Sequence, residues 1–127
     1  MVLVVGGGLL LRPRVDQQAG TARAAIASRP IGRVTVEVLN GTRRQGAART
    51  ATRLLRRSGL DVVFLGNADS LVPSTRVVAR RGDSVRARYV ASALGTGLVM
   101  IETDTFRRVD VSVILGDDFR PKLELHP

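Results

Sequence analysis

Two stretches of this chain repeat one order of hydrophobic patterns, and that order limits the folds open to it. In the first stretch, valines alternate with polar residues over 34–39, which predicts a half-buried strand that ends at the turn Asn40-Gly41. Apolar residues then recur at helical spacing between Gln45 and Ser58, and Gly59 supplies the stop. Asp61 to Leu65 predicts the next strand. The first stretch is therefore a strand, a helix and a strand.

The second stretch has the same order. Strands are predicted over 75–79 and 98–101, on either side of a helix that begins at Asp83 and ends at Gly95. A last alternating segment, 109–115, adds one strand to the repeated order. The β-α-β-β-α-β order predicts an α/β (α+β sandwich) fold, with two helices packed on one face of a four- or five-stranded sheet.

Both predicted helices are amphipathic. Their inward stripes are Ala47, Ala48, Ala51, Leu54 and Leu55 in the first helix, and Ala87, Val90, Ala91 and Leu94 in the second. Arginines occupy the opposite face of the first helix at the same helical spacing. The core is therefore expected to be small and mainly aliphatic.

Composition argues against an enzyme. The 127 residues make one ordinary domain with an extension, and they contain no Cys and a single His, His126, near the C-terminus. Thiolate chemistry, a Ser-His triad and structural zinc are thereby excluded, and we expect no catalytic residue, metal or cofactor. The pair Asp117-Asp118 follows a predicted strand without the spacing of a calcium loop, so we interpret it as a turn.

The loop before the first helix has the outline of a phosphate-binding loop, because four residues separate Gly41 from Gly46. It lacks the Lys and the Ser or Thr that nucleotide hydrolysis requires. One interpretation is that free backbone N–H groups at the helix N-terminus, beside Arg43 and Arg44, receive an anion. The other is that Asn40-Gly41 only turns the chain and that Thr42 caps the helix.

Basic residues outnumber acidic ones by 20 to 11, and all but Lys122 are Arg. Their densest group lies on the first helix and its entry loop, with a second group on 76–88. Either these faces are solvated surface, or they contact an anionic partner, such as wall polymer, lipid head groups or nucleic acid. RNA recognition by base stacking is disfavoured, because strands 34–39 and 75–79 hold no aromatic residue. The hypothetical anion site comprises Asn40, Gly41, Thr42, Arg43, Arg44, Gly46, Arg49, Arg53, Arg56 and Arg57.

The N-terminal residues divide into an apolar segment, 1–11, and a linker, 12–32, of Ala, Gln, Gly, Arg and Pro. A membrane span needs about 20 apolar residues, so residues 1–11 do not cross a bilayer alone. They are either the second half of a truncated membrane anchor or a buried or frayed terminal segment, and the spacing favours neither. By the positive-inside rule, the arginines that follow residues 1–11 favour a cytoplasmic location for the chain on that side of the segment.

Several segments together resemble the LytR C-terminal domain family, which is associated with LytR/CpsA/Psr proteins of the cell envelope. The resemblance runs in order from about Arg33 to Phe119, which leaves a tail over 120–127. It is carried by Val36-Glu37-Val38-Leu39-Asn40-Gly41-Thr42, Gly46-Ala47-Ala48, Gly59, Val63 to Asp69, Thr75 to Val78, Gly82-Asp83, the stripe and glycine over 87–95, and Val109 to Phe119.

The resemblance implies a non-catalytic, extracytoplasmic accessory domain near the bacterial cell wall, either behind a phosphotransferase domain or alone behind one membrane anchor. The family often carries an aromatic residue where this chain has Ala79-Arg80-Arg81, so no role of that residue is carried over. The expected partner is an anionic wall polymer, peptidoglycan or a membrane surface; no small-molecule substrate is identified. The alternative is a cytoplasmic nucleic-acid-binding or transcription-attenuator-type regulator, although no helix-turn-helix is legible.

Overall fold

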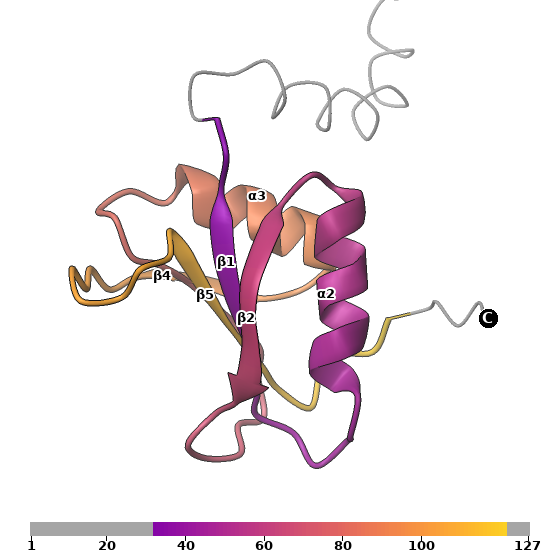
Figure 1. The fold of residues 1–127 in the computed structure, drawn as a ribbon. Coiled ribbons are helices and arrows are strands. Elements are labelled where there is room, and N and C mark those ends of the chain that lie inside the picture. Colours follow the sequence, from indigo (N-terminus) through magenta and orange to yellow (C-terminus); the bar gives the residue numbers. More distant parts are fainter. Residues whose placement is uncertain (1–31, 122–127) are drawn as a thin grey trace, which may run out of the picture. The chain divides into compact units, whose positions relative to one another are not determined.

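A computed structural model describes residues 32–121 (Figure 1). The predicted apolar segment 1–11 and all of the linker but Gly32 lie outside the described residues, as do residues 122–127 of the tail. The two interpretations of residues 1–11 therefore stay predictions. Within residues 32–121, no helix is long and apolar enough to cross a membrane.

Seven elements follow one another within residues 32–121, and their order confirms the predicted α/β class. The strands are β1 (Thr35–Asn40), β2 (Asp61–Asn67), β3 (Arg76–Ala79), β4 (Leu98–Ile101) and β5 (Val111–Leu115), and the helices are α2 (Ala47–Arg57) and α3 (Val85–Leu94). The strand-helix-strand order occurs twice, as β1-α2-β2 and β3-α3-β4, and β5 is the additional strand.

The five strands form one mixed sheet in the order β2-β1-β5-β3-β4. Each helix connects two parallel neighbours, because β1 pairs with β2 and β3 pairs with β4 in parallel. The last strand enters the middle, where it runs parallel to β1 and antiparallel to β3. The two strand-helix-strand units are thus joined edge to edge by a strand that follows both in the chain.

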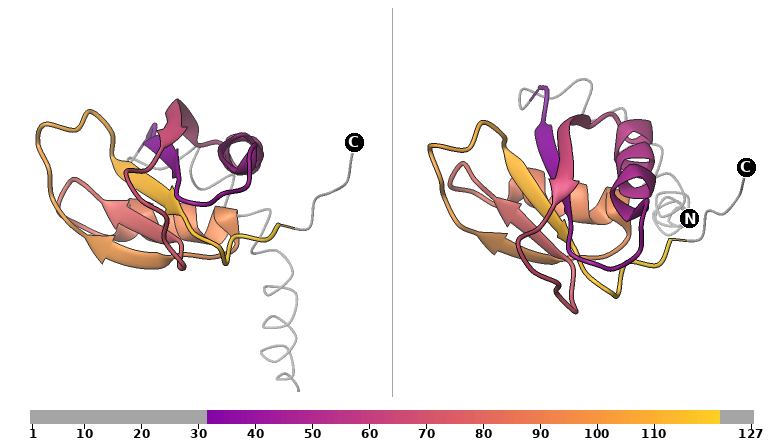
Figure 2. Two further views of the ribbon diagram at one scale, coloured as in Figure 1. Left: turned by 90° about the horizontal axis from the view of Figure 1, so that it is seen from below. Right: turned by 60° about the horizontal axis from the view of Figure 1, so that its bottom comes forward.

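Both helices lie on one side of the sheet and pack against each other (Figures 1 and 2). The core between the two layers is aliphatic, as predicted. Its fully buried side chains include Val36, Val38, Leu55, Val90, Val113 and Leu115. The inward stripe of α2 differs from the prediction in detail, because Ala48 and Leu54 are only half-buried, whereas Thr52 is buried and its hydroxyl donates to the Ala48 carbonyl.

The helix ends follow the glycines. After α2, the N–H of Gly59 donates to the Arg56 carbonyl and that of Leu60 to the Leu55 carbonyl, the paired bonds of a Schellman motif, with Gly59 at φ 84°. Gly95 ends α3 in the same left-handed conformation, at φ 89°. At the start of α3, Ser84 occupies the N-cap position. Asp83 lies one residue before it, and its side chain accepts a hydrogen bond from the Val85 N–H at 3.0 Å.

The face of the sheet away from the helices has no second layer of secondary structure within residues 32–121. A network of hydrogen-bonded polar side chains lies on it. The Ser112 hydroxyl donates to Glu37 Oε2 at 2.5 Å and accepts from Arg80 Nε at 2.9 Å. Arg107 donates to the same Glu37 oxygen at 2.6 Å, and Arg80 pairs with Glu102 at 3.0 Å. The network joins β1 and β5 to the segments that follow β3 and β4, and it leaves Glu37 only 8% exposed.

Candidate anion-binding surface

The turn between β1 and α2 is built around the side chain of Asn40. Its Oδ1 accepts from the N–H of Thr42 at 2.9 Å and from the Thr42 hydroxyl at 2.7 Å, while Nδ2 donates to the Arg44 carbonyl at 3.0 Å. Gly41 is required by close approach, since a Cβ there would lie 2.7 Å from the Leu115 carbonyl oxygen. The predicted Asn40-Gly41 turn is therefore confirmed.

Thr42 does not cap the helix, so that part of the prediction is wrong. Its hydroxyl accepts instead from the N–H of Arg44 at 3.0 Å, inside the turn. The N-cap position is Gly46, whose φ is 85° and which has no side chain to offer. The first turn of α2 consequently has neither a side-chain cap nor an acidic residue, although helix N-termini favour both.

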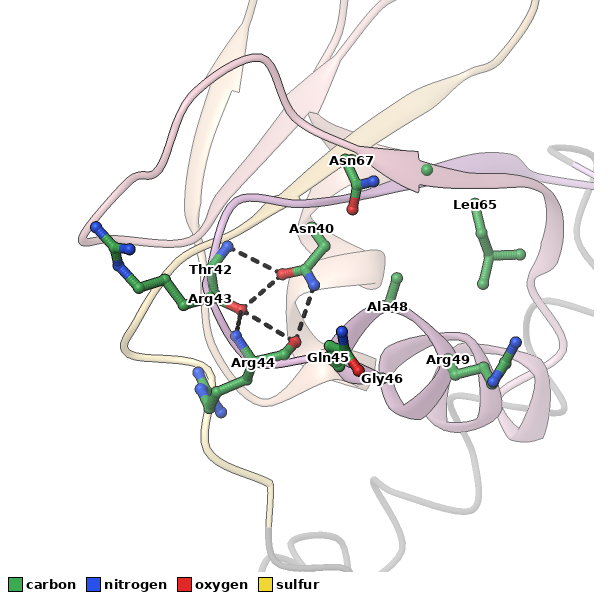
Figure 3. A pocket seen from close by; sticks show the side chains of 11 residues that line it. Asn40, Thr42, Arg43, Arg44, Gln45, Gly46, Ala48, Arg49, Leu65 and Asn67 are labelled. Atoms are coloured by element: carbon green, nitrogen blue, oxygen red, sulfur yellow. Dashed lines mark hydrogen bonds between the residues drawn. The ribbon is translucent and has the colours of Figure 1, made fainter.

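A surface pocket of about 480 Å³ opens beside this bare helix end (Figure 3). Asn40 and Asn67, from the ends of two neighbouring parallel strands, lie at its centre, and Ala48 and Leu65 face each other along one side. The remaining lining residues are Thr42, Arg43, Arg44, Gln45, Gly46, Arg49 and Gly66. The lining contains no carboxylate, imidazole or thiol.

The arginines of the pocket lie around its rim and do not converge on one point. In Figure 3 the guanidinium groups of Arg43, Arg44 and Arg49 point away from one another and from the two asparagines. Arg44 is held by the C-terminal segment, because its Nη2 donates to the Phe119 carbonyl at 2.8 Å. This geometry suits contact at several separate points better than the enclosure of one small anion.

The predicted arginine face of α2 is present. Arg49, Arg53, Arg56 and Arg57 are all exposed along one side of the helix, opposite the buried stripe. At about 1.5 Å rise per residue, the row from Arg49 to Arg57 is about 12 Å long. Arg56 also donates to the Val62 carbonyl at 2.9 Å, which fixes its position while its charge stays uncompensated.

The helix and its entry loop together carry six arginines: Arg43, Arg44, Arg49, Arg53, Arg56 and Arg57. None of them makes an ion pair with a residue of 32–121. The second predicted basic group differs. Arg80 pairs with Glu102 and Arg81 with Asp110, so two of its five members are neutralised by neighbours. Of the ten residues of the hypothetical anion site, six line the pocket. Gly41 is buried in the turn, and Arg53, Arg56 and Arg57 lie farther along the helix, outside the pocket.

Two structural features were not predicted from the sequence, one at the site and one outside it. Asn67 ends β2 and reaches the pocket only because β2 pairs in parallel with β1, so no local pattern marked it. The turn at Asp117-Asp118 is confirmed, but Asp118, which follows β5 and lies outside the pocket, also accepts hydrogen bonds from Thr75, just before β3. Neither pairing has a signal within its own segment.

The structure is a small two-layer α/β domain, whose mixed sheet is assembled from two strand-helix-strand units. Its arginine face has no ion-pair partner in residues 32–121, and its pocket is lined without a carboxylate or an imidazole. The chain belongs to the family described as LytR cell envelope-related transcriptional attenuator, whose model matches residues 33–119. The family assignment associates the domain with the cell envelope. No curated protein and no solved structure gave a significant match.

Proposed function

We propose that this protein is a non-catalytic binding domain of the bacterial cell envelope that holds an extended anionic wall polymer on the arginine face of α2. The observation that carries the proposal is the lack of ion-pair partners for the six arginines within residues 32–121. Clustered like charges repel one another and lower the stability of a compact domain unless an anion offsets them. Membership in a cell-envelope-related family supplies the setting.

The arrangement of the arginines favours a polymer over a small anion. The rim guanidinium groups diverge in Figure 3, and the helical row extends the basic face for about 12 Å beyond the pocket. A repeating phosphate or carboxylate chain meets such a face at several points, and each guanidinium can form a bidentate hydrogen-bonded pair with one anionic group. The N-terminus of α2, which has no side-chain cap, adds backbone N–H groups at one end of the row.

A purely binding role agrees with the chemistry of the pocket. General acid-base catalysis needs a placed proton donor or acceptor, and the pocket lining holds only amide, hydroxyl, guanidinium and apolar groups. Within residues 32–121, no three His, Cys, Asp or Glu side chains are close enough to hold a metal ion. We therefore assign no reaction and no cofactor to the domain, and we place it outside the cytoplasmic membrane if an anchor precedes it.

Retention of the full chain on purified cell wall, measured across a salt series against immobilised duplex DNA, tests this function. We expect retention on wall that falls as salt rises, and weaker retention on DNA. The double variant Arg49→Gln/Arg53→Gln should release the chain at lower salt. The double variant Arg76→Gln/Arg88→Gln is the Arg76 control: it also removes two charges, and both residues are exposed and without an ion-pair partner in residues 32–121, but they lie on β3 and α3.

Two outcomes would overturn the proposal. One is steeply salt-dependent binding to DNA with no retention on wall, which is the behaviour of a nucleic-acid-binding protein. The other is equal loss of wall retention in the α2 double variant and in the Arg76 control, which would mean that net charge and not the α2 face governs binding.

A further inference from the structure

The loop between β4 and β5 holds the most exposed large apolar side chain of residues 32–121. Phe106 is 92% exposed, compared with 61% for Leu98 and 53% for Phe64. Single exposed apolar residues are common on protein surfaces and need no special explanation. The features of this loop that point to a partner are its hydrogen bonding, its charges and its position on the domain.

Hydrogen bonds hold the backbone of the loop, from which the exposed phenyl ring projects. The N–H of Phe106 donates to Asp104 Oδ1 at 3.0 Å, and the N–H of Arg107 donates to the Asp104 carbonyl at 3.2 Å. From the segment after β3, Arg81 Nη2 donates to the Arg107 carbonyl at 2.9 Å. A loop whose backbone is already held in this way loses little backbone freedom when it docks.

Three arginines line a surface hollow together with Phe106. The hollow, of about 500 Å³, is lined by Arg81, Thr105, Phe106, Arg107 and Arg108. Arg107 points inward to Glu37 and also pairs with Asp104. Arg108 is exposed and has no ion-pair partner in residues 32–121, so its charge is free to meet an anionic group beside the phenyl ring.

The loop lies at the end of the sheet where the chain enters the domain. It rejoins the sheet beside the first residue of β1, where the N–H of Asp110 donates to the Thr35 carbonyl at 3.0 Å. The Asn40 pocket lies at the other end of the same strand.

We propose that the Phe106 loop docks on a lipid bilayer with anionic head groups, with the ring in the interface and Arg108 at the head-group phosphates. Phe side chains bury their apolar surface at the boundary between head groups and acyl chains, and basic side chains are attracted to anionic leaflets. A wall polymer or nucleic acid matches the arginine but offers less to a lone phenyl ring than a bilayer interface does. This contact is independent of the polymer bound by α2, because it uses the opposite end of β1.

A tryptophan probe tests the contact locally. The natural chain has no Trp, so Phe106→Trp gives the full chain a single tryptophan, at the loop tip, which can be excited apart from Tyr89. With vesicles of phosphatidylcholine and phosphatidylglycerol, we expect the emission to shift to shorter wavelength and brominated lipid to quench it. Phe64→Trp is the matched control: Phe64 is an exposed aromatic on β2, so its Trp should show neither change even if residues 1–11 tether both variants to the vesicle.

The charge requirement is tested in the Phe106→Trp background. Arg108→Gln should raise the vesicle concentration that gives half of the shift by about five-fold, the effect of one basic side chain at an anionic surface. Arg76→Gln, at the far end of β3, should leave it unchanged. Both residues are exposed, so neither substitution disturbs the core.

Several results would overturn the proposal. They are an unchanged Phe106→Trp spectrum with anionic vesicles, an equal shift in the Phe64→Trp control, and an equal shift with vesicles of phosphatidylcholine alone. A shift that grows with protein concentration in the absence of lipid would assign the loop to a second copy of this chain instead.

Discussion

Asp118 anchors Thr75 across the sheet. Its Oδ1 accepts both the N–H and the hydroxyl of Thr75, at 2.9 and 2.6 Å, and Thr75 Oγ1 in turn accepts from the N–H of Gly116 at 2.9 Å. Thr75 is fully buried just before β3, and Asp118 follows β5. A matching pair occurs at the other end of β5, where Asp110 Oδ2 accepts from the N–H and hydroxyl of Thr35. The central strand is thus fastened at both ends by an aspartate-threonine pair.

Loss of the Asp118 carboxylate should therefore destabilise the whole domain. We expect Asp118→Ala to lower the free energy of unfolding by about 2 kcal/mol, because a buried N–H and hydroxyl lose a charged acceptor. Asp117→Ala is the control, because the side chain of Asp117 is exposed and accepts no hydrogen bond from residues 32–121. Urea unfolding of both variants measures the difference, and equal effects would contradict this assignment.

The buried pair of Glu37 and Arg107 should be coupled more strongly than the surface pair of Arg33 and Asp61. The carboxylate of Glu37 is 10% exposed and Arg107 40%, against 69% for Arg33 and 37% for Asp61. Double-mutant cycles with Gln and Asn substitutions should give about 1–2 kcal/mol for the buried pair and under about 1 kcal/mol for the surface pair. A buried-pair coupling that vanishes in moderate salt would argue against its burial.

Two glycines should respond differently to alanine. At Gly116 a Cβ would lie 2.4 Å from the backbone carbon of Ser74, so Gly116→Ala has to displace backbone and should cost about 3 kcal/mol. At Gly46 nothing lies within 4 Å of a Cβ, and the φ of 85° alone should cost Gly46→Ala about 1 kcal/mol. Thermal unfolding ranks the two variants; the reverse ranking would show that the close approach at Gly116 is easily relieved.

Asn40 should stabilise the pocket loop, whereas Asn67 should not. Asn40→Ala removes an acceptor of two hydrogen bonds and a donor of one, so we expect a loss of about 2 kcal/mol and faster amide hydrogen exchange at Thr42 and Arg44. Asn67 lines the same pocket, but its side chain forms no hydrogen bond within residues 32–121. Asn67→Ala should leave both measurements nearly unchanged; similar exchange in the two variants would refute the role given to Asn40.

The elements themselves were predictable because their signals are local. The valine alternation around Val36 marked β1, the apolar stripe with its opposed arginines marked α2, and Gly59 and Gly95 marked the helix ends. Strand neighbours were not predictable in this way. Both β1 and β5 alternate, so the pattern assigns each of them a buried face but does not say which strands lie beside it.

The exceptions to the local pattern depend on distant residues. Alternation places Glu37 on the polar face of β1, yet it is buried because Arg107, 70 residues later, lies over it. The prediction that Thr42 caps α2 failed because Asn40 binds its hydroxyl and draws it into the turn. The arginine face was visible in the sequence, but its lack of ion-pair partners in residues 32–121 depends on where every carboxylate lies in the fold.

The position of β5 determines when this domain can fold. Residues 111–115 separate β1 from β3 in the sheet, so the two strand-helix-strand units share no direct strand pairing, and the pairing of β5 with β1 links residues 75 positions apart, such as Val36 and Val111. A chain that emerges from a ribosome or a translocation channel with its N-terminus first cannot close the sheet until this segment is free. Folding of the domain is thereby delayed until residues 111–115 have emerged, and until then both units present unpaired strand edges to whatever binds nascent chains.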